Sequence, residues 1–257
     1  MLVPQEFSVA NIAELHRIMT SHPLGALVTP TATGLNVNHI PFELNPDGGA
    51  LGVLTGHVAR ANPVWQECAG AAYDVLVIFR GNEGYISPSW YPAKKQTHRF
   101  VPTWNYEVVH ARGKLIVHDD EKFLRGVLAR LTRRHEATEP KPWKMGDAPP
   151  DFLNDMIKAV VGIEIIIHHL EGMAKLSQNR EQCDFDGTAT RSKALSHQVS
   201  AQRKRIGAKP SHDFAVELFW REQLHRPEPA AVPIPDRIER TARQVDSESQ
   251  IDRKSVV

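Results

Sequence analysis

The order of helical and strand-like segments is the sequence feature that most limits how this chain can fold. Helical spacing of apolar residues over 9–20, with Ser8 as the expected cap, precedes a series of short strand-like runs. Two helical stretches and a further strand-like run follow. The strand-like runs cover 24–30, 38–44, 50–56, 73–80, 106–117 and 160–170. Because helices do not alternate regularly with strands, the pattern predicts a mainly β (α+β) fold, an antiparallel barrel with peripheral helices.

Turn and cap residues place the boundaries between these segments. The run from Asn45 to Gly49 indicates a turn, and Asp119 or Asp120 can cap the next long helix. Residues 58–70 are expected to form a short helix. EGMAKLSQ at 171–178 is expected to be the hairpin partner of the strand before it.

Composition excludes several classes of protein. The 257 residues include 31 basic and 30 acidic ones, so the net charge of +1 gives no molecule-wide electrostatic surface for nucleic acid. Cys68 and Cys183 are too few for a disulfide framework, and no apolar run reaches the roughly 20 residues needed to cross a bilayer. The N-terminal sequence lacks the pattern of a signal peptide. We therefore expect a cytoplasmic protein without a membrane segment.

The C-terminal part of the sequence has a different character. HRPEPAAVPIPDR is rich in proline, and the residues after it are polar and charged. Such a segment has too little apolar surface to offset the entropy lost on ordering. The sequence therefore predicts one folded domain over 1–225 and a disordered tail over 226–257.

The first segment that could carry chemistry is TGHVARANP at 55–63. His57 lies at the end of a strand, where a histidine can ligate iron through one ring nitrogen. Arg60 could hold a phosphate or propionate through its planar fork, and Asn62 follows it. The same residue types also make an ordinary capped turn between a strand and a helix, so both interpretations stay open.

The second segment, at 83–113, is locally rich in aromatic and cationic residues. Trp90, Tyr91 and Trp104 could stack on a planar ring, while Lys94 and Lys95 could meet an anionic group. An ordinary aromatic core beneath a basic loop is the alternative. Aromatic residues among cations also suit single-stranded nucleic acid, although the near-zero net charge disfavours that option.

The third segment is EGMAKLSQNR at 171–180. Lys175, Ser177 and Gln178 lie close together in the sequence and could bind phosphate or carboxylate oxygens; a plain polar strand end is the alternative. The basic fragment at 191–209 could contact nucleic-acid phosphates. It carries no DNA-binding motif, which favours a solvated helix and linker.

Together these segments resemble the PaiB family, which is described as FMN-binding negative transcriptional regulators. GHVARANP, SPSWYP and VPTWNY are each unlikely by chance, and all three occur here. The matching stretches keep the expected order from residue 1 to about 180. They are MLVPQEF, HPLGALVT, NHIPFEL, GHVARANPVW, VLVIFRG, GYISPSWYP, VPTWNYEVVHARG, RHEA, PW, VGIEI and KLSQNR.

The resemblance implies a flavin-reductase-like, FMN-binding split β-barrel that forms a homodimer, with the planar cofactor at the subunit interface. Arg60, Lys175 and Ser177 would then hold anionic groups of the cofactor. The aromatic residues of the second segment would line its ring. The full set of expected cofactor-binding residues is His57, Arg60, Asn62, Trp90, Tyr91, Trp104, Lys175, Ser177 and Gln178.

The same family includes piperazate synthase, a haem enzyme that forms a nitrogen–nitrogen bond. Its iron ligand is a histidine in a segment similar to GHVARANP, which would make His57 the metal ligand if the cofactor were haem b. The resemblance therefore favours an FMN-binding protein of redox or regulatory function and leaves two alternatives. One is a haem-dependent enzyme of the piperazate synthase kind, and the other is a DNA-binding repressor. Whether the protein is a flavin- or haem-dependent oxidoreductase is not decided by its sequence.

Overall fold

The computed structural model describes residues 1–191 apart from 33, 69–72 and 189. The predicted boundary at residue 225, the predicted tail over 226–257 and nearly all of the basic fragment 191–209 lie outside the described residues. The strands are β1 (Leu24–Thr31), β2 (Gly34–Pro41), β3 (Glu43–Asn45), β4 (Val53–Ala59), β5 (Tyr73–Ile86), β6 (Thr103–His118) and β7 (Val160–Lys175). The helices are α1 (Ile12–Ser21), α2 (Val64–Glu67), α3 (Lys94–Thr97), α4 (Glu121–Glu136) and α5 (Pro150–Lys158).

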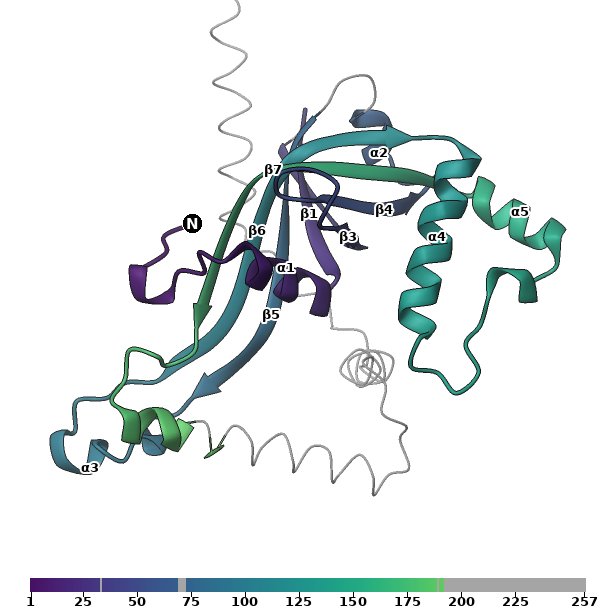
Figure 1. Cartoon of the computed structure of the whole chain (residues 1–257). Coiled ribbons are helices and arrows are strands. Elements are labelled where there is room, and N and C mark those ends of the chain that lie inside the picture. The colour runs from purple at the N-terminus through teal and green to yellow at the C-terminus, as the bar shows by residue number, and fades with distance from the viewer. Residues whose placement is uncertain (33, 69–72, 189, 192–257) are drawn as a thin grey trace, which may run out of the picture. The chain divides into compact units, whose positions relative to one another are not determined.

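All seven of these strands belong to one antiparallel sheet. Their order across the sheet is β2-β1-β5-β6-β7-β4-β3, so β7 returns to lie between β6 and β4. The three longest strands, β5, β6 and β7, are neighbours and extend together from the α4 end of the sheet to the end that carries α3 (Figure 1). These long strands therefore connect two distant groups of residues.

The sheet curls so that β2 approaches β4, although the two are not paired. A Cβ added at Gly56 would lie 3.2 Å from Ile40 Cγ2 and 3.3 Å from the carbonyl oxygen of Pro41. Asn62 Nδ2 also donates a 2.7 Å hydrogen bond to Asn38 Oδ1 across this gap. The predicted mainly β fold, a split barrel with peripheral helices, is confirmed.

Alternation along the strands produces the apolar core inside the barrel. Val77 and Phe79 of β5 and Ile163 and Ile165 of β7 are fully buried, and their neighbours in sequence point the other way. Phe42, between β2 and β3, packs edge-on against Phe79 with ring centroids 6.1 Å apart. The core thus follows the period-two pattern of the sequence.

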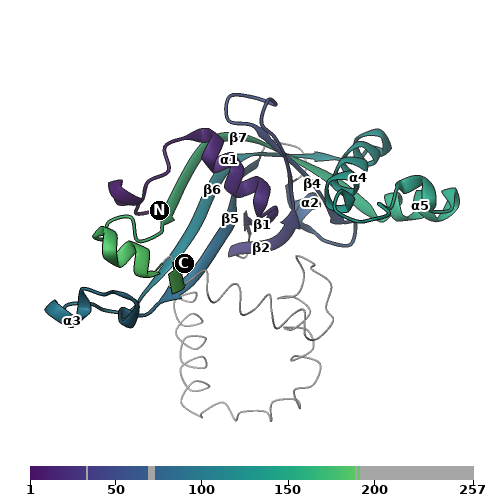
Figure 2. The same ribbon diagram turned by 60° about the horizontal axis from the view of Figure 1, so that its bottom comes forward.

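Helix α1 lies across β5, β6 and β7 (Figure 2). Its apolar face buries Leu15, Ile18 and Met19, and Asn11 caps it by accepting a 2.9 Å hydrogen bond from the Ala13 N–H. The prediction that Ser8 is the cap was therefore wrong. Ser8 instead pairs with Met173 in an isolated β-bridge.

Two other predicted elements differ in the structure. Residues 171–175 continue β7 rather than turning back as a hairpin partner. Gly172 is not a turn residue: a Cβ there would lie 2.1 Å from Leu15 Cδ2, so the glycine makes room for α1. The predicted helix over 58–70 also begins later, because β4 runs through Ala59 and α2, the helix among the described residues of this stretch, starts after Pro63.

Candidate functional site

His57 lies on β4 with its side chain on the face opposite the core. Leu54 and Val58 point into the core, whereas His57 shares the other face with Thr55. The imidazole is half-buried and makes no hydrogen bond with any described residue, and its buried Nδ1 has no partner. Burial lowers the pKa of His57, so the ring is neutral at ordinary pH. A neutral imidazole without partners is free to bind an added group.

Two further side chains, those of His118 on β6 and Phe123 on α4, lie on this face of the sheet. Gly162 of β7 pairs with His57 on one side and with His118 of β6 on the other. Phe123 of α4 lies directly over Gly162, because a Cβ added there would come within 2.6 Å of Phe123 Cδ1. The rings of His118 and Phe123 are stacked with centroids 3.9 Å apart, and His118 Nε2 is 3.6 Å from Glu164 Oε1. The β4 end of the sheet therefore carries two histidines, each with a buried ring nitrogen that makes no hydrogen bond to a described residue.

Beside this group lies an open cavity of about 840 Å³ between α4 and the strands β3, β4 and β7. Thr55, Phe123 and Glu164 line it, together with charged residues of both signs. Arg130 and Glu43 in its wall are 2.5 Å apart and neutralise each other. The cavity is thus mixed in charge.

Arg60, predicted to hold an anion, has acidic and carbonyl partners in the chain itself. Its guanidinium donates two hydrogen bonds to Asp119, of 2.6 and 2.9 Å, and two more to the carbonyl oxygens of Lys158 and Val160. The bond to Asp119 raises the pKa of Arg60 and lowers that of Asp119. In this chain Arg60 therefore ties the end of β4 to α4 and α5.

Asn62 also has a structural role within the chain. Besides its bond to Asn38, its Oδ1 accepts a 3.0 Å hydrogen bond from the Val64 N–H at the start of α2. The Trp65 indole donates to the carbonyl oxygen of Arg60 at 2.9 Å, which closes the same turn. His57 thus carries the one polar side chain of GHVARANP that makes no hydrogen bond within the described residues.

The other predicted residues lie at the far end of the long strands. Trp104 of β6 is 55% exposed and meets Tyr85 of β5 edge-on, with ring centroids 6.1 Å apart. Lys175, at the end of β7, donates a hydrogen bond to Thr103 and a 3.0 Å bond to the carbonyl oxygen of Trp104. The exposed ring of Trp104 offers a face for stacking, whereas the Lys175 ammonium already has acceptors within the chain.

Trp90 and Tyr91 occupy the loop between β5 and β6. Tyr91 is 2% exposed and stacks on Phe100 at a centroid distance of 5.0 Å. The Arg180 guanidinium lies over both rings, 5.2 Å from that of Tyr91 and 5.7 Å from that of Phe100. Trp90 is half-buried beside them. Tyr91 is therefore a core residue of this loop, and only Trp90 keeps a partly free surface.

Ser177 and Gln178 hold the turn after β7. Ser177 has a positive φ of 68° and is bonded to the Asn105 side chain, whose Nδ2 donates to Ser177 Oγ at 3.0 Å. The Gln178 amide donates to the carbonyl oxygens of Glu6 and Ala174. Both residues thus orient backbone and side chains of their own chain.

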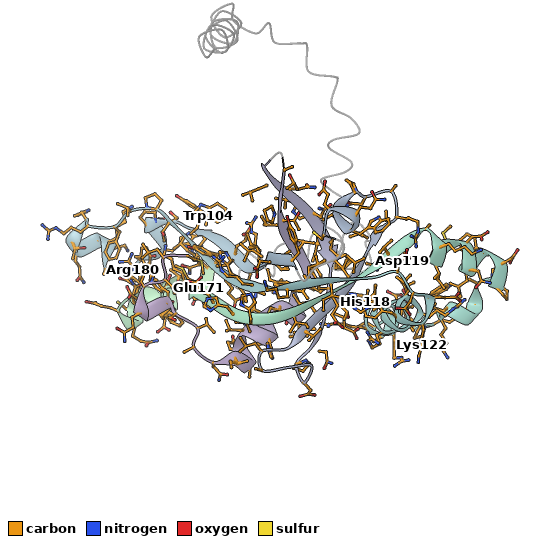
Figure 3. All side chains as sticks on the ribbon, turned by 90° about the horizontal axis from the view of Figure 1, so that it is seen from above. Trp104, His118, Asp119, Lys122, Glu171 and Arg180 are labelled. Atoms are coloured by element: carbon orange, nitrogen blue, oxygen red, sulfur yellow. The ribbon has the colours of Figure 1, made fainter. Side chains whose placement is uncertain are left out.

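The predicted site residues consequently form two clusters at opposite ends of one sheet. We call His57, Arg60 and Asn62 the β4 cluster. The far cluster comprises Trp90, Tyr91, Trp104, Lys175, Ser177 and Gln178. Figure 3 shows this separation, with Trp104 and Arg180 at one end of the strands and His118 and Asp119 at the other. Within one chain the structure does not bring the two clusters together.

Sequence reasoning did not identify His118 and Phe123 as neighbours of His57. His118 directly follows the predicted strand-like run 106–117 and precedes the predicted helix cap, which is a weak signal for a functional residue. Its position relative to His57 depends on the pairing of both strands with Gly162, which local periodicity does not encode. Among the described residues, no group of three or more His, Cys, Asp or Glu side chains could hold a metal ion. No helix in this part of the chain is long and apolar enough to cross a bilayer.

Comparison with known proteins gives a consistent family match. Residues 1–169 match the model of a domain described as "Putative FMN-binding domain". The chain is 32% identical over 185 residues to protease synthase and sporulation protein PAI 2 of Bacillus subtilis, covering 72% of this chain and 86% of that protein. It is 34% identical over 212 residues to the uncharacterised protein AN0679 of Emericella nidulans, covering 69% and 84%. The flavocytochrome Anf3 of Azotobacter vinelandii superposes with a TM-score of 0.52 at 12% identity, covering 70% of this chain and 75% of Anf3, which shows a shared fold.

Proposed function

Because the chain belongs to the family of this FMN-binding domain, which includes the Bacillus PAI 2 protein, we propose that it binds FMN between two copies of itself and serves a redox or regulatory function. A bound flavin supplies an electron acceptor and donor, and the protein determines what reaches it. The separation of the two clusters is the observation that supports a cofactor site at the subunit interface. Neither cluster alone offers both an aromatic stacking face and an unpartnered imidazole.

A symmetric dimer would bring the two clusters together across the subunit interface. A twofold axis perpendicular to the long strands, near the middle of β6, places the far end of one protomer beside the β4 end of its partner. The exposed ring of Trp104 then faces the partner's His57 end, and the same contact occurs twice. Each dimer would hold two equivalent sites.

The residues present fit a planar, partly polar group. The Trp104–Tyr85 pair exposes aromatic surface on which an isoalloxazine ring can stack. The half-buried, unpartnered His57 can hydrogen-bond a ring heteroatom. Arg60 and Lys175 already donate hydrogen bonds within the chain. They would contribute by holding the strand ends beside His57 and Trp104 in place.

Heterodimers of two variants test the shared site directly. His57→Ala and Trp104→Ala should each weaken FMN binding about tenfold, because each removes one contact of a kind that contributes about 1–2 kcal/mol. If every site takes His57 from one chain and Trp104 from the other, a heterodimer of the two variants has one intact site. It should bind one FMN per dimer with the wild-type dissociation constant, as measured by flavin fluorescence quenching on differently tagged, co-purified chains.

The controls separate this result from simpler explanations. Trp143→Ala removes another tryptophan of similar exposure, outside both clusters, and should leave the affinity unchanged. A heterodimer in which no site recovers wild-type affinity would contradict the shared site. A protein that sediments only as a monomer with FMN bound would contradict the dimer.

Haem is a second candidate, and the state of His57 favours it. Iron ligation needs a neutral imidazole, and burial lowers the pKa of this unpartnered ring. If haem b is the cofactor, the purified protein shows an intense Soret band that His57→Ala abolishes or reshapes. If FMN is the cofactor, the yellow flavin spectrum persists in the same variant.

A further inference from the structure

A second cavity lies at the end of the sheet that carries the far cluster. Of the predicted cofactor-binding residues, Trp90 and Tyr91 line it. It has a volume of about 660 Å³, within the range of small-molecule sites. The loop carrying Trp90 and Tyr91 forms one side, and helical residues 182–188 with Thr190 and Arg191 form the other. We call it the loop cavity.

The two sides of the loop cavity are joined by specific contacts. Asp184, 2% exposed, accepts a 3.1 Å hydrogen bond from the Ala93 N–H. A Cβ added at Gly187 would lie 2.4 Å from the carbonyl oxygen of Trp90, so the helical segment packs directly on the loop. The loop cavity is therefore held open by packing and by a buried carboxylate.

Cations dominate the charge around this cavity. Lys94, Lys95 and Arg191 line it, and none of them has an ion pair or side-chain hydrogen bond with another described residue. The His98 side chain also lines the cavity. The acidic residue of the lining is Asp186, whose carboxylate accepts a 2.9 Å hydrogen bond from Gln182. An anion entering the cavity would thus meet three cations that lack partners in the described chain.

The remaining lining is aromatic and apolar. Trp90 presents a half-buried indole, with Pro92 beside it, and the buried hydroxyl of Tyr91 has no hydrogen-bond partner among the described residues. Aromatic faces stack on planar rings, while lysine ammonium groups bind phosphate as point charges. These two chemistries occur together in a phosphate monoester attached to an aromatic ring system.

We propose that the loop cavity binds the phosphate end of a mononucleotide, with Lys94 and Lys95 as the phosphate-binding residues. The ligand is either FMN or another mononucleotide such as AMP, since both carry this group. For FMN the proposal rests on the proposed function above and names the cations that bind its phosphate. Arg60 and Lys175, predicted from the sequence for that role, already donate hydrogen bonds to acceptors within the chain.

Titration calorimetry on the full chain tests the proposal with two matched pairs of ligands. FMN is compared with riboflavin, and AMP with adenosine, so that each pair differs by one phosphate. The wild type should bind the phosphorylated member of at least one pair at least tenfold more tightly than the unphosphorylated member. In the double variant Lys94→Ala/Lys95→Ala that preference should disappear, while affinity for the unphosphorylated partner stays the same.

Two further variants control for charge and for folding. Lys141→Ala/Lys158→Ala removes the same charge from exposed positions outside the loop cavity and should keep the preference. Lys94→Arg/Lys95→Arg retains the charge and should keep most of the preference for the phosphorylated ligand. Because both lysine side chains lack described partners, the melting temperature of the alanine variant should match the wild type.

The outcomes distinguish this proposal from the proposed function. If neither FMN nor riboflavin binds the wild type, flavin binding fails, whereas a lysine-dependent preference for AMP would still support the loop cavity. Absence of a phosphate preference in both pairs would overturn the proposal. So would a preference that survives in the alanine variant, or lysine-dependent binding of an oligonucleotide when neither mononucleotide binds.

Discussion

Glu107 is a buried carboxylate whose removal should be costly, and its partners allow the cost to be worked out. The side chain is 5% exposed and lies beside the bulge between Arg80 and Glu83 on β5. It accepts hydrogen bonds from the Asn82 backbone N–H at 3.2 Å and the Asn82 amide at 3.0 Å. Arg17 of α1 donates a third bond of 2.7 Å. One carboxylate thus connects α1 to an irregular point in the sheet.

The expected cost follows from what each partner loses in Glu107→Ala. Asn82 would lose its hydrogen bonds to a charged acceptor, and hydrogen bonds to charged groups contribute about 1.5–3 kcal/mol. The bond to Arg17 contributes less than a fully buried pair, about 1 kcal/mol, because the Arg17 side chain is 45% exposed and screened by solvent. We therefore expect a loss of about 3 kcal/mol, which corresponds to a melting temperature roughly 10 °C lower. Glu107→Gln keeps an acceptor oxygen and should lose less.

Urea unfolding at neutral pH measures this loss, and neighbouring residues provide matched controls. Glu14 is an exposed carboxylate bonded to the same Arg17, at 2.9 Å, so Glu14→Ala should barely move the unfolding midpoint. Gly81→Ala should resemble Glu107→Ala, since the new Cβ would lie 2.7 Å from Glu107 Cβ and displace the carboxylate. If Glu107→Ala costs less than about 1 kcal/mol, or no more than Glu14→Ala, the reasoning is wrong.

Two other predictions concern histidines and a glycine. Burial lowers the pKa of both His57 and His110 in the folded state, so the unfolded chain binds more protons below about pH 6.5. Stability should therefore fall as pH decreases from about 7 to 5. Melting temperatures of His57→Asn measured over this range should depend less on pH than those of the wild type. An equally steep dependence in the variant would argue against a contribution from His57. Gly162→Ala should destabilise the protein by about 1–3 kcal/mol, because the new Cβ would lie 2.6 Å from Phe123 and 3.0 Å from the His118 carbonyl oxygen. Denaturant unfolding checks it, and a neutral result would mean that α4 can shift freely.

Local patterns in the sequence predicted much of the secondary structure. The run at 24–30 became β1, those at 73–80 and 106–117 became parts of longer strands, and Asp120 caps α4 through the Phe123 N–H. These features depend on residues within a few positions of one another, where periods of 2 and 3.6 and cap chemistry act directly. The family resemblance likewise rested on contiguous motifs, and the family match confirmed it.

The roles of the polar residues depended on contacts between distant parts of the chain. Arg60 was predicted to bind an anion, and nothing near it in the sequence indicates that Asp119 provides one. Residues 171–178 were expected to form a separate hairpin strand, yet Gly172 lies within β7, where it pairs with Val109 of β6 and leaves room for Leu15 of α1. In each case the deciding partner is more than 50 residues away, and only the folded chain brings the two together.

What the sequence determined by itself was therefore most of the strands and long helices, the core-facing positions and the chemical types available for a site. What only the tertiary structure decided was which of those groups remain free. His57, Lys94 and Lys95 have no side-chain partners among the described residues, whereas Arg60, Asn62, Lys175, Ser177 and Gln178 are bonded within the chain. The physical reason is that a polar side chain that becomes buried forms hydrogen bonds with whatever donors and acceptors the fold places beside it. Strand register, rather than proximity in sequence, determines which groups those are.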